Sequence, residues 1–394
     1  MKTLDRIILH CDLNNFFASV SLLENQTLIN RPVAVGGDKE QRHGIILAKN
    51  EIAKKFGVKT AEAIWEAKRK CPDLIILPPD YKKYTEYSLR AKEIYQRYTD
   101  MIEPFGIDEC WLDITGSTLL FGSGEEIAHK IRREIKKELG ITISVGVSFN
   151  KVFAKLGSDM KKPDAVTVIS RENFKEKVWP LGIEVLLFAG RKTVEKLNSS
   201  GVFTVGDITL CSDDMLTRLL GKNGIDLKRY ALGEDNSKVS DAHLHEKPKS
   251  IGRSVTESAD FTNSDEVWQT FITLSEEISK NLRKHGLYAG GVQIHTRNSE
   301  LKIKEFSRKL DTPTDMSLVI AKAGLSLFEE NYYWDLPLRS VGIRAINLKD
   351  AVYARQQDIF SDFELTDKKE KIENSIYEIR EKFGDKSIKR GRNS

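Results

Sequence analysis

The sequence predicts a multidomain protein of the α+β class, and three observations lead to that prediction. The 394 residues suffice for two to four domains of ordinary size. Apolar runs typical of strands alternate with helical patterns over residues 6–169 and again over residues 249–348. Between these regions, residues 174–233 indicate short helices punctuated by glycines. We therefore expect two α+β regions separated by an all-helical module.

Composition excludes several classes of protein. Hydrophobic residues make up 40% and charged residues 30% of the chain, which is typical of soluble globular proteins. No apolar run approaches the roughly 20 residues that span a bilayer, and no signal peptide precedes the first strand, so we expect a cytoplasmic protein. The four cysteines have no paired spacing, which favours reduced thiols over zinc ligands or disulfides. The net charge of +4 is mild, so any basic surface must be local.

Two acidic positions lie beside apolar strands. The first strand ends at Asp12, and a helix is expected from residue 14 to 23, strands over 32–37 and 44–48, and a helix over 50–70. After a helix at 81–101, residues 105–113 predict a hairpin that carries Asp108 and Glu109. Adjacent strand residues point to opposite faces, so these two acids share a site only if the backbone departs from regular extension, which Gly106 permits. A helix at 124–140, a strand at 141–147, a helix at 151–160 and a strand at 166–169 follow.

Acids next to buried strands are costly to desolvate unless a cation offsets their charge. Mg²⁺ prefers such oxygen ligands together with substrate phosphates. Two ions about 3.5–4 Å apart would hold the attacking and leaving oxygens of a phosphoryl displacement. The alternative is a pair of solvated turn acids, and spacing alone does not decide between the two.

Several segments, in one order along the chain, carry a family resemblance. They include the run Asp12-Leu13-Asn14-Asn15-Phe16-Phe17, the run Phe105-Gly106-Ile107-Asp108-Glu109, and residues 31–37, 53–59, 144–163, 201–207, 249–252 and 337–343. Together they resemble the Y-family DNA polymerases of the DinB, or polymerase IV, type. The resemblance implies a right-hand polymerase with palm (1–25 and 78–173), fingers (26–77), helix-hairpin-helix thumb (174–234), linker (235–248), little finger (249–350) and tail (351–394).

The resemblance also implies an activity and a site. It implies low-fidelity translesion synthesis by a bacterial, nucleoid-associated protein that uses primer-template DNA and deoxynucleoside triphosphates, and a monomer is the default expectation. Asp12, Asp108 and Glu109 take the catalytic positions and, with the Leu13 carbonyl, the positions of two Mg²⁺ ions, with Mn²⁺ as the alternative metal. Phe17 takes the position of the steric gate against ribose. The remaining nucleotide-binding positions fall on Phe16, Lys54 and Lys162.

The sequence departs from the family pattern at a few positions. Ala48, Glu51 and Lys54 stand where the family presents Thr, Tyr and Arg toward the triphosphate, so a carboxylate replaces a donor. We expect weakened or rearranged nucleotide binding, with Lys49 or Lys55 as substitutes. Ser21 replaces an acid of the opening motif. In the thumb, the first hairpin has lost one glycine, and Phe188 stands there.

DNA contacts are expected from the thumb and from the second α+β region. Alternation over residues 301–304 predicts that Lys302 and Lys304 share one strand face while Leu301 and Ile303 pack inward. Such cations grip the DNA backbone regardless of sequence. Further DNA-binding candidates are Gly190, Gly206, Ser250, Arg253, Arg297, Arg308, Lys309, Arg339 and Arg344.

The tail carries two further patterns. Gln356, Ile359 and Phe360 resemble the short peptide by which bacterial polymerases bind the sliding clamp, with the two apolar side chains as anchors. Apolar residues at helical spacing then predict a helix over residues 366–384, capped by Thr366, whose apolar face packs in a core or on a partner.

Two other functions remain open at this point. Because the fingers and thumb depart from the pattern, the chain is alternatively an inactive family member that binds DNA and the clamp for an active partner. A nucleotide cyclase is the third hypothesis, since residues 36–38 loosely resemble a turn of palm-fold cyclases. It leaves the thumb and little finger without a role.

Overall fold

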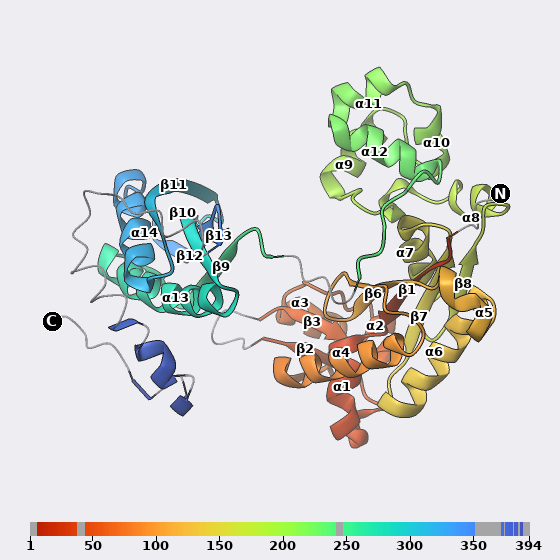
Figure 1. Cartoon of the computed structure of the whole chain (residues 1–394), viewed down its shortest axis with the longest axis horizontal. Coiled ribbons are helices and arrows are strands. Elements are labelled where there is room, and N and C mark those ends of the chain that lie inside the picture. The colour runs from red at the N-terminus through yellow and green to blue at the C-terminus, as the bar shows by residue number, and fades with distance from the viewer. Residues whose placement is uncertain are drawn as a thin grey trace. The chain divides into compact units, whose positions relative to one another are not determined.

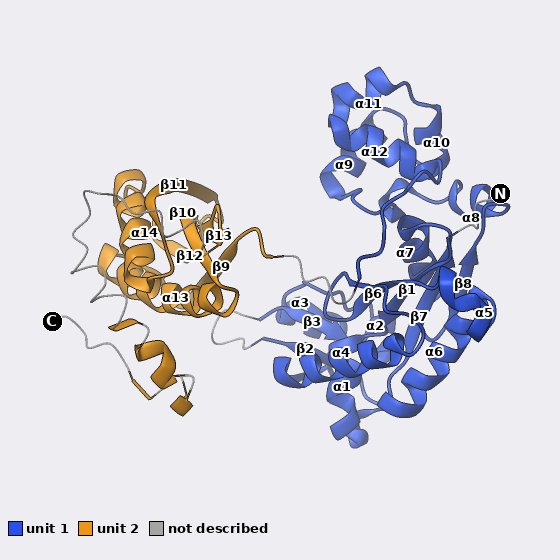
Figure 2. Cartoon of the chain, in the orientation of Figure 1, with its two compact units in different colours: residues 1–39, 44–245 blue, residues 40–43, 246–394 orange. Residues whose placement is uncertain are grey.

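The computed structural model describes residues 6–37, 44–241 and 247–350, and in the tail residues 372–373, 375–380, 382–384 and 387–388. The chain divides into two compact units (Figure 2), residues 1–39 with 44–245 and residues 40–43 with 246–394. Over the described residues, no helix is both long and apolar enough to cross a membrane.

A five-stranded sheet forms the centre of the first unit (Figure 1). Its order is β5 (Ile102–Pro104), β6 (Glu109–Asp113), β1 (Ile8–Leu13), β7 (Ile143–Ser148) and β8 (Val166–Ile169). Alternate residues of β1, namely Leu9, Cys11 and Leu13, join a core with α1 (Phe16–Glu24), α4 (Tyr81–Gln96) and α6 (Gly124–Leu139). The even-numbered residues of β1 face α7 (Lys151–Met160), where Ile8 packs against Ala154. Asp12 therefore lies on the α7 face of the sheet.

Helix α7 lies unusually close to β7. A side chain on Gly146 would place its Cβ 1.9 Å from the carbonyl oxygen of Ala154 and 2.5 Å from the amide nitrogen of Ser158. Only a glycine fits here, because backbone atoms of the helix occupy that space. This close approach fixes the height of α7 above the sheet, and with it the position of every side chain that α7 directs at the strands.

A smaller sheet stands beside the main one in the same unit. It has the order β3 (Ile46–Lys49), β2 (Val33–Gly36) and β4 (Ile75–Leu77), with α2 (Glu51–Lys55) and α3 (Ile64–Lys70). The predicted single helix over 50–70 is wrong. Gly57 and Ala61 adopt positive φ, and two backbone hydrogen bonds join this segment to β3, from the Ala61 amide to the Ile46 carbonyl and from the Ile46 amide to the Glu62 carbonyl. These tertiary hydrogen bonds outweigh the helical propensity of the segment.

Residues 174–231 form helices, as expected, and their core also includes Val152, Phe153 and Leu156 of α7. They comprise α8 (Phe174–Val178), α9 (Arg191–Ser199), α10 (Val205–Leu210), α11 (Asp213–Leu220) and α12 (Lys222–Ala231). The first half of the predicted linker is not a free connector. Asp235 caps the amide of Lys151 at the start of α7, and Val239 is buried against Ile8 and Trp111. Composition did not reveal this docking because only one large apolar residue carries it.

The second unit is an antiparallel sheet with two helices. Its order is β11 (Ile303–Thr314), β10 (Leu287–Asn298), β12 (Leu338–Ile346) and β9 (Ile251–Phe261), and β13 (Lys349–Asp350) pairs with β10. Helices α13 (Ser264–Lys284) and α14 (Ser317–Asn331) bury one face, where Val341 and Ile343 belong to the core. The prediction that Leu301 and Ile303 pack inward is wrong. They are 50% and 56% exposed, because β11 is an edge strand whose packing on the core begins only at Phe306.

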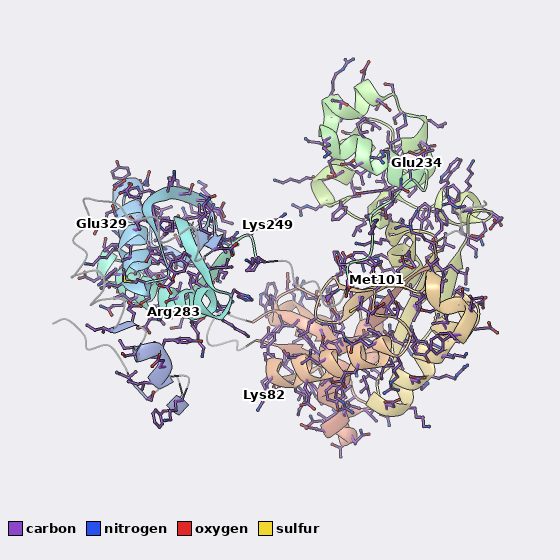
Figure 3. The ribbon with its side chains drawn as sticks, viewed as in Figure 1. Lys82, Met101, Glu234, Lys249, Arg283 and Glu329 are labelled. Atoms are coloured by element: carbon purple, nitrogen blue, oxygen red, sulfur yellow. The ribbon has the colours of Figure 1, made fainter. Side chains whose placement is uncertain are left out.

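The described tail residues pack on the second unit through polar groups. The Glu373 carboxylate accepts hydrogen bonds from the amide and hydroxyl of Ser317 at the start of α14, and it lies 3.5 Å from the guanidinium of Arg283, labelled in Figure 3. Ile372 and Phe383 are exposed. Packing in a core is therefore wrong for these two residues, packing on a partner stays a prediction, and the expected cap at Thr366 lies outside the described residues.

Candidate active site

Strand register brings the first two acids together. Asp12 of β1 is the direct partner of Glu109 of β6 in the antiparallel pairing. Directly paired side chains lie on the same face, here the one covered by α7. Asp12 is 5% exposed and Glu109 is half-buried. Two carboxylates from distant parts of the chain thus meet at the end of the central strand.

Asp108 stands just before β6, in the turn that links it to β5. The amides of Phe105 and Gly106 both approach the Glu109 carbonyl, at 2.9 and 3.4 Å, so the turn is tight at its base. The Leu13 amide donates to the Asp108 carbonyl over 3.1 Å. Since an extended residue directs its N–H and C=O to the same side, the Leu13 carbonyl lies on the side of Asp108. Asp108 itself lies in the bend before β6, outside the regular strand. This departure from regular extended backbone is what Asp108 and Glu109 need in order to share one site.

Two lysines, Lys155 of α7 and Lys162 just after the end of this helix, neutralise the paired carboxylates. Lys155 Nζ lies 3.0 Å from Glu109 Oε1, and Lys162 Nζ lies 2.7 Å from Asp12 Oδ2. Asp159 is within 3.4 Å of Lys155 and 2.8 Å of Lys162. Acidic and basic side chains therefore alternate in one continuous row of ion pairs that joins Glu109 to Asp12.

His10 lies beneath this row of ion pairs. Its Nδ1 is 2.8 Å from the hydroxyl oxygen of Ser158, and its Nε2 is 3.6 Å from Glu109 Oε2, longer than a hydrogen bond. Burial, opposed by the nearby Glu109, lowers the pKa of His10. The buried imidazole fills the space between β1 and α7 below the carboxylates.

Three carboxylates, those of Asp12, Asp108 and Glu109, lie near only two lysines, so the site has an excess of negative charge. Burial raises the pKa of Asp12 to about 7 despite the contact with Lys162. Burial and the neighbouring Glu109 raise the pKa of Asp108. Burial also opposes the ionised form of Glu109, but His10 and Lys155 lower its pKa to about 2. The site therefore favours an added cation.

The donor set fits a hard divalent cation. Asp12, Asp108, Glu109 and the Leu13 carbonyl supply only oxygen, the ligand type that Mg²⁺ prefers. Among the residues that the structure describes, no three Asp, Glu, His or Cys side chains are grouped so that they could hold a metal ion by themselves. A Mg²⁺ ion at these carboxylates would therefore need ligands from substrate oxygens and water as well.

Phe17 is the second residue of α1 and lies beside α4. Its ring stacks on Tyr84 with centroids 4.2 Å apart, and Tyr81 meets it edge-on at 5.9 Å. Ser21, which replaces the family acid, forms a 2.8 Å hydrogen bond with the Tyr84 hydroxyl. The Phe16 side chain, in contrast, is buried in the core, so only its backbone is available to a nucleotide. The ring of Phe17 is thus held rigidly, in part by the residue that departs from the pattern.

Glu51, the acid that departs from the family pattern, is the first residue of α2 and is bound to the residue before α1. Glu51 Oε1 accepts a 2.9 Å hydrogen bond from Asn15, the residue before α1, and lies 3.6 Å from Lys54 Nζ. Lys49 donates to Thr60, and burial lowers its pKa. Lys55 is exposed. Of the predicted nucleotide-binding lysines, Lys54 is therefore held by an acid of its own helix.

Helices α9 and α10 position the two predicted thumb glycines differently. Gly190 precedes α9 in open space, whereas a Cβ at Gly206 would lie 3.2 Å from the Trp179 carbonyl. Phe188 has φ of 70° and is 58% exposed. A bulky aromatic residue thus occupies a left-handed position next to the first hairpin.

The predicted cations of the second unit fall on two different faces. Arg344 is the strand partner of Gln293 and lies on the sheet face that the helices do not cover. Lys309, Arg297 and His295 lie on the same face. Arg253 forms a 3.0 Å ion pair with Glu277 of α13. On the same helix-covered side, Arg308 pairs with Glu330 of α14, and Lys304 lies at the margin of that side, opposite Thr296. Lys302 precedes β11 and pairs with Glu300, Ser250 precedes β9, and Arg339 is half-buried in β12.

Sequence reasoning missed four residues of the site: His10, Lys155, Ser158 and Asp159. Positions 155, 158 and 159 share one face of the helix predicted over residues 151–160, and this signal was present in the sequence. The predicted clamp-binding residues Gln356, Ile359 and Phe360 lie outside the described residues, as does Asp38 of the cyclase hypothesis.

Comparison with known proteins places the chain in a class. The fold resembles the solved structure of a Y-family DNA polymerase chimera of Dbh and Dpo4, with a TM-score of 0.78 over 87% of this chain and 99% of that one, at 24% sequence identity. Models of the impB/mucB/samB family and of its C-terminal domain match residues 11–159 and 248–359.

Curated relatives match along nearly the whole length. DNA polymerase IV of Acetivibrio thermocellus is 47% identical over 98% of this chain and 97% of its own. DNA polymerase IV 1 of Bacillus subtilis is 35% identical over 98% of this chain and 92% of its own. The chain belongs to the impB/mucB/samB family.

Proposed function

We propose that this protein is a DNA-directed DNA polymerase that performs translesion synthesis by metal-dependent nucleotidyl transfer. The whole-length similarity to polymerases named DNA polymerase IV supports the activity. The observation that carries the mechanism is the pairing of Asp12 with Glu109 across β1 and β6, next to Asp108. The substrates are primer-template DNA and deoxynucleoside triphosphates.

Asp12, Asp108, Glu109 and the Leu13 carbonyl would hold the metal, for which we propose two Mg²⁺ ions, with Mn²⁺ as a substitute. Bound metal would lower the pKa of the attacking hydroxyl and offset negative charge on the transferred phosphoryl group. The protein positions these ligands by strand register and by the tight turn at Phe105 and Gly106. Because Asp12, Leu13 and Glu109 belong to paired strands and Asp108 to the tight turn beside them, little reorganisation would accompany the reaction.

Side chains around the carboxylates would select and hold the nucleotide. The ring of Phe17, fixed against Tyr84, would crowd a ribose 2′-hydroxyl and leave deoxyribose room. Lys162 pairs with Asp12 in this structure and would turn toward the triphosphate once a cation offsets that carboxylate. Lys54 would be a second phosphate contact, in competition with Glu51.

The second unit would grip the duplex with the sheet face opposite its helices. Arg344, Lys309 and Arg297 lie there, and Arg297 Nε is a buried nitrogen without a hydrogen-bond partner among the described residues. Contacts of this kind address the phosphate backbone and make binding strongly dependent on salt. We further propose that the chain acts as a monomer in the bacterial cytoplasm, close to the nucleoid, and that Gln356, Ile359 and Phe360 bind the sliding clamp.

Primer extension tests the proposal. Purified protein, Mg²⁺ and four deoxynucleotides should extend a primer on undamaged and on lesion-bearing templates. Asp108→Ala and Glu109→Ala should each abolish extension and leave DNA binding nearly unchanged. If the wild-type chain adds no nucleotide at any nucleotide concentration, the alternative of an accessory DNA-binding protein replaces the enzyme.

A further inference from the structure

Residues 49–70 carry a concentrated positive charge. This segment holds seven Lys or Arg residues and three Glu residues, a net charge of +4 that equals the net charge of the whole chain. The remaining residues are therefore neutral in sum, and this stretch around α2 and α3 is the local basic surface that the overall composition concealed.

The acids of this segment are already engaged. Glu51 binds Asn15, Glu62 pairs with Lys70, and the Glu66 side chain accepts a hydrogen bond from the Ala63 amide at the start of α3. Four exposed cations of the segment have no ion pair among the described residues: Lys55, Lys59, Lys68 and Arg69. Their charge is available to an external anion.

Two aromatic side chains stand among these cations, outside the core of the small sheet. That core consists of smaller side chains such as Ile46, Val58 and Ile64, whereas Phe56 is 53% and Trp65 57% exposed. The guanidinium carbon of Arg69, one helical turn after Trp65, lies 5.5 Å from the centre of the indole ring. The exposed indole and the guanidinium beside it therefore lie together on a surface that also carries unpaired cations.

We propose that Trp65 and Arg69 form a stacking platform for unpaired bases of the single-stranded template ahead of the active site. This inference rests on the proposed polymerase function and adds a DNA-binding site to it. Every base offers a π-face to an indole, and the surrounding cations match the phosphates, so the surface combines both features of single-strand binding. A second copy of the chain is the poorer occupant, because the same patch would face its own positive charge.

Binding to matched DNA substrates tests the platform. The full-length protein is titrated with a primer-template that carries a template overhang of about ten nucleotides and with the same duplex lacking it. Trp65→Ala should weaken binding to the overhang substrate by about fivefold or more and leave the blunt duplex unchanged, since one stacked base is lost. Trp65→Phe should retain most of the affinity, and Trp65→Leu should not. Lys137→Gln, which removes an exposed charge from α6, is the control for charge alone.

The outcomes separate this inference from the proposed function. Equal affinity of Trp65→Ala and wild type for the overhang, or an equal loss for both substrates, overturns the platform. So does a change in sedimentation that depends on Trp65, which would assign the patch to a contact between copies. DNA binding does not require catalysis. These measurements therefore test the platform even if primer extension fails and the polymerase proposal is overturned. A matching thermal midpoint for the variants excludes misfolding.

Discussion

Glu51 should limit the affinity of this protein for nucleotides. Its carboxylate lies 3.6 Å from Lys54, the cation expected to contact the triphosphate, and would itself repel that anion. Glu51→Gln keeps an acceptor for the Asn15 amide and removes the charge, so the local structure should persist. The substitution frees Lys54 and removes the repulsion, and both effects favour the nucleotide.

The size of the effect follows from the exposure of the pair. Unit charges at this separation attract by about 1 kcal/mol in water, and measured surface pairs contribute about 0.2–1 kcal/mol. Since both side chains are at least one-third exposed, we take about 0.5–1 kcal/mol, which corresponds to a two- to fivefold lower KM for deoxynucleotides. The assay is steady-state primer extension, with KM and kcat measured separately.

Two further variants make this test specific. Glu125→Gln, at an exposed acid of α6, makes the same charge change away from the site and should leave KM unchanged. In Glu51→Gln/Lys54→Ala the gain should disappear, because it acts through Lys54. An unchanged or higher KM in Glu51→Gln would refute the competition and leave Glu51 as a structural partner of Asn15 alone.

Three other substitutions test the fold, the electrostatics and the DNA face. Gly146→Ala should cost about 3 kcal/mol or more, since its Cβ would overlap the backbone of α7, and the thermal midpoint should fall by about 6 °C or more. Because the folded state raises the pKa of Asp108, ionisation of this carboxyl destabilises the protein as pH rises above the unfolded value of 3.8. Asp108→Asn should therefore raise the midpoint at pH 7 without metal by about 2–4 °C for each kcal/mol relieved, with no gain below about pH 4 and less gain in Mg²⁺. Arg344→Ala should weaken DNA binding by about threefold or more and flatten its salt dependence, whereas Arg253→Ala, on the helix-covered side, should change it little; equal losses would contradict the assignment of faces.

The sequence was sufficient for the positions of the acids but not for their surroundings. Asp12 and Glu109 could be predicted as candidate metal ligands because each adjoins an apolar strand. Their direct pairing depends on strand register, which no local pattern specifies. The two helices in place of one over residues 50–70 result from hydrogen bonds to β3, a tertiary effect. Leu301 and Ile303 were expected to pack inward from the alternation of the sequence, but alternation does not tell where an edge strand begins or where it leaves the core, and Leu301 precedes β11 with a positive φ.

The arrangement of α7 links the stability of the fold to the electrostatics of the site. Lys155 on α7 and Lys162, two residues beyond the end of this helix, each reach a carboxylate on a different strand. A displaced α7 would carry both lysines away from these carboxylates, and the buried Asp12 without its counterion would cost several kcal/mol. Gly146 permits the observed position of α7, because only its missing side chain lets the helix backbone settle on β7. A glycine on a strand without acidic residues thus decides whether the site can hold three carboxylates before any metal arrives.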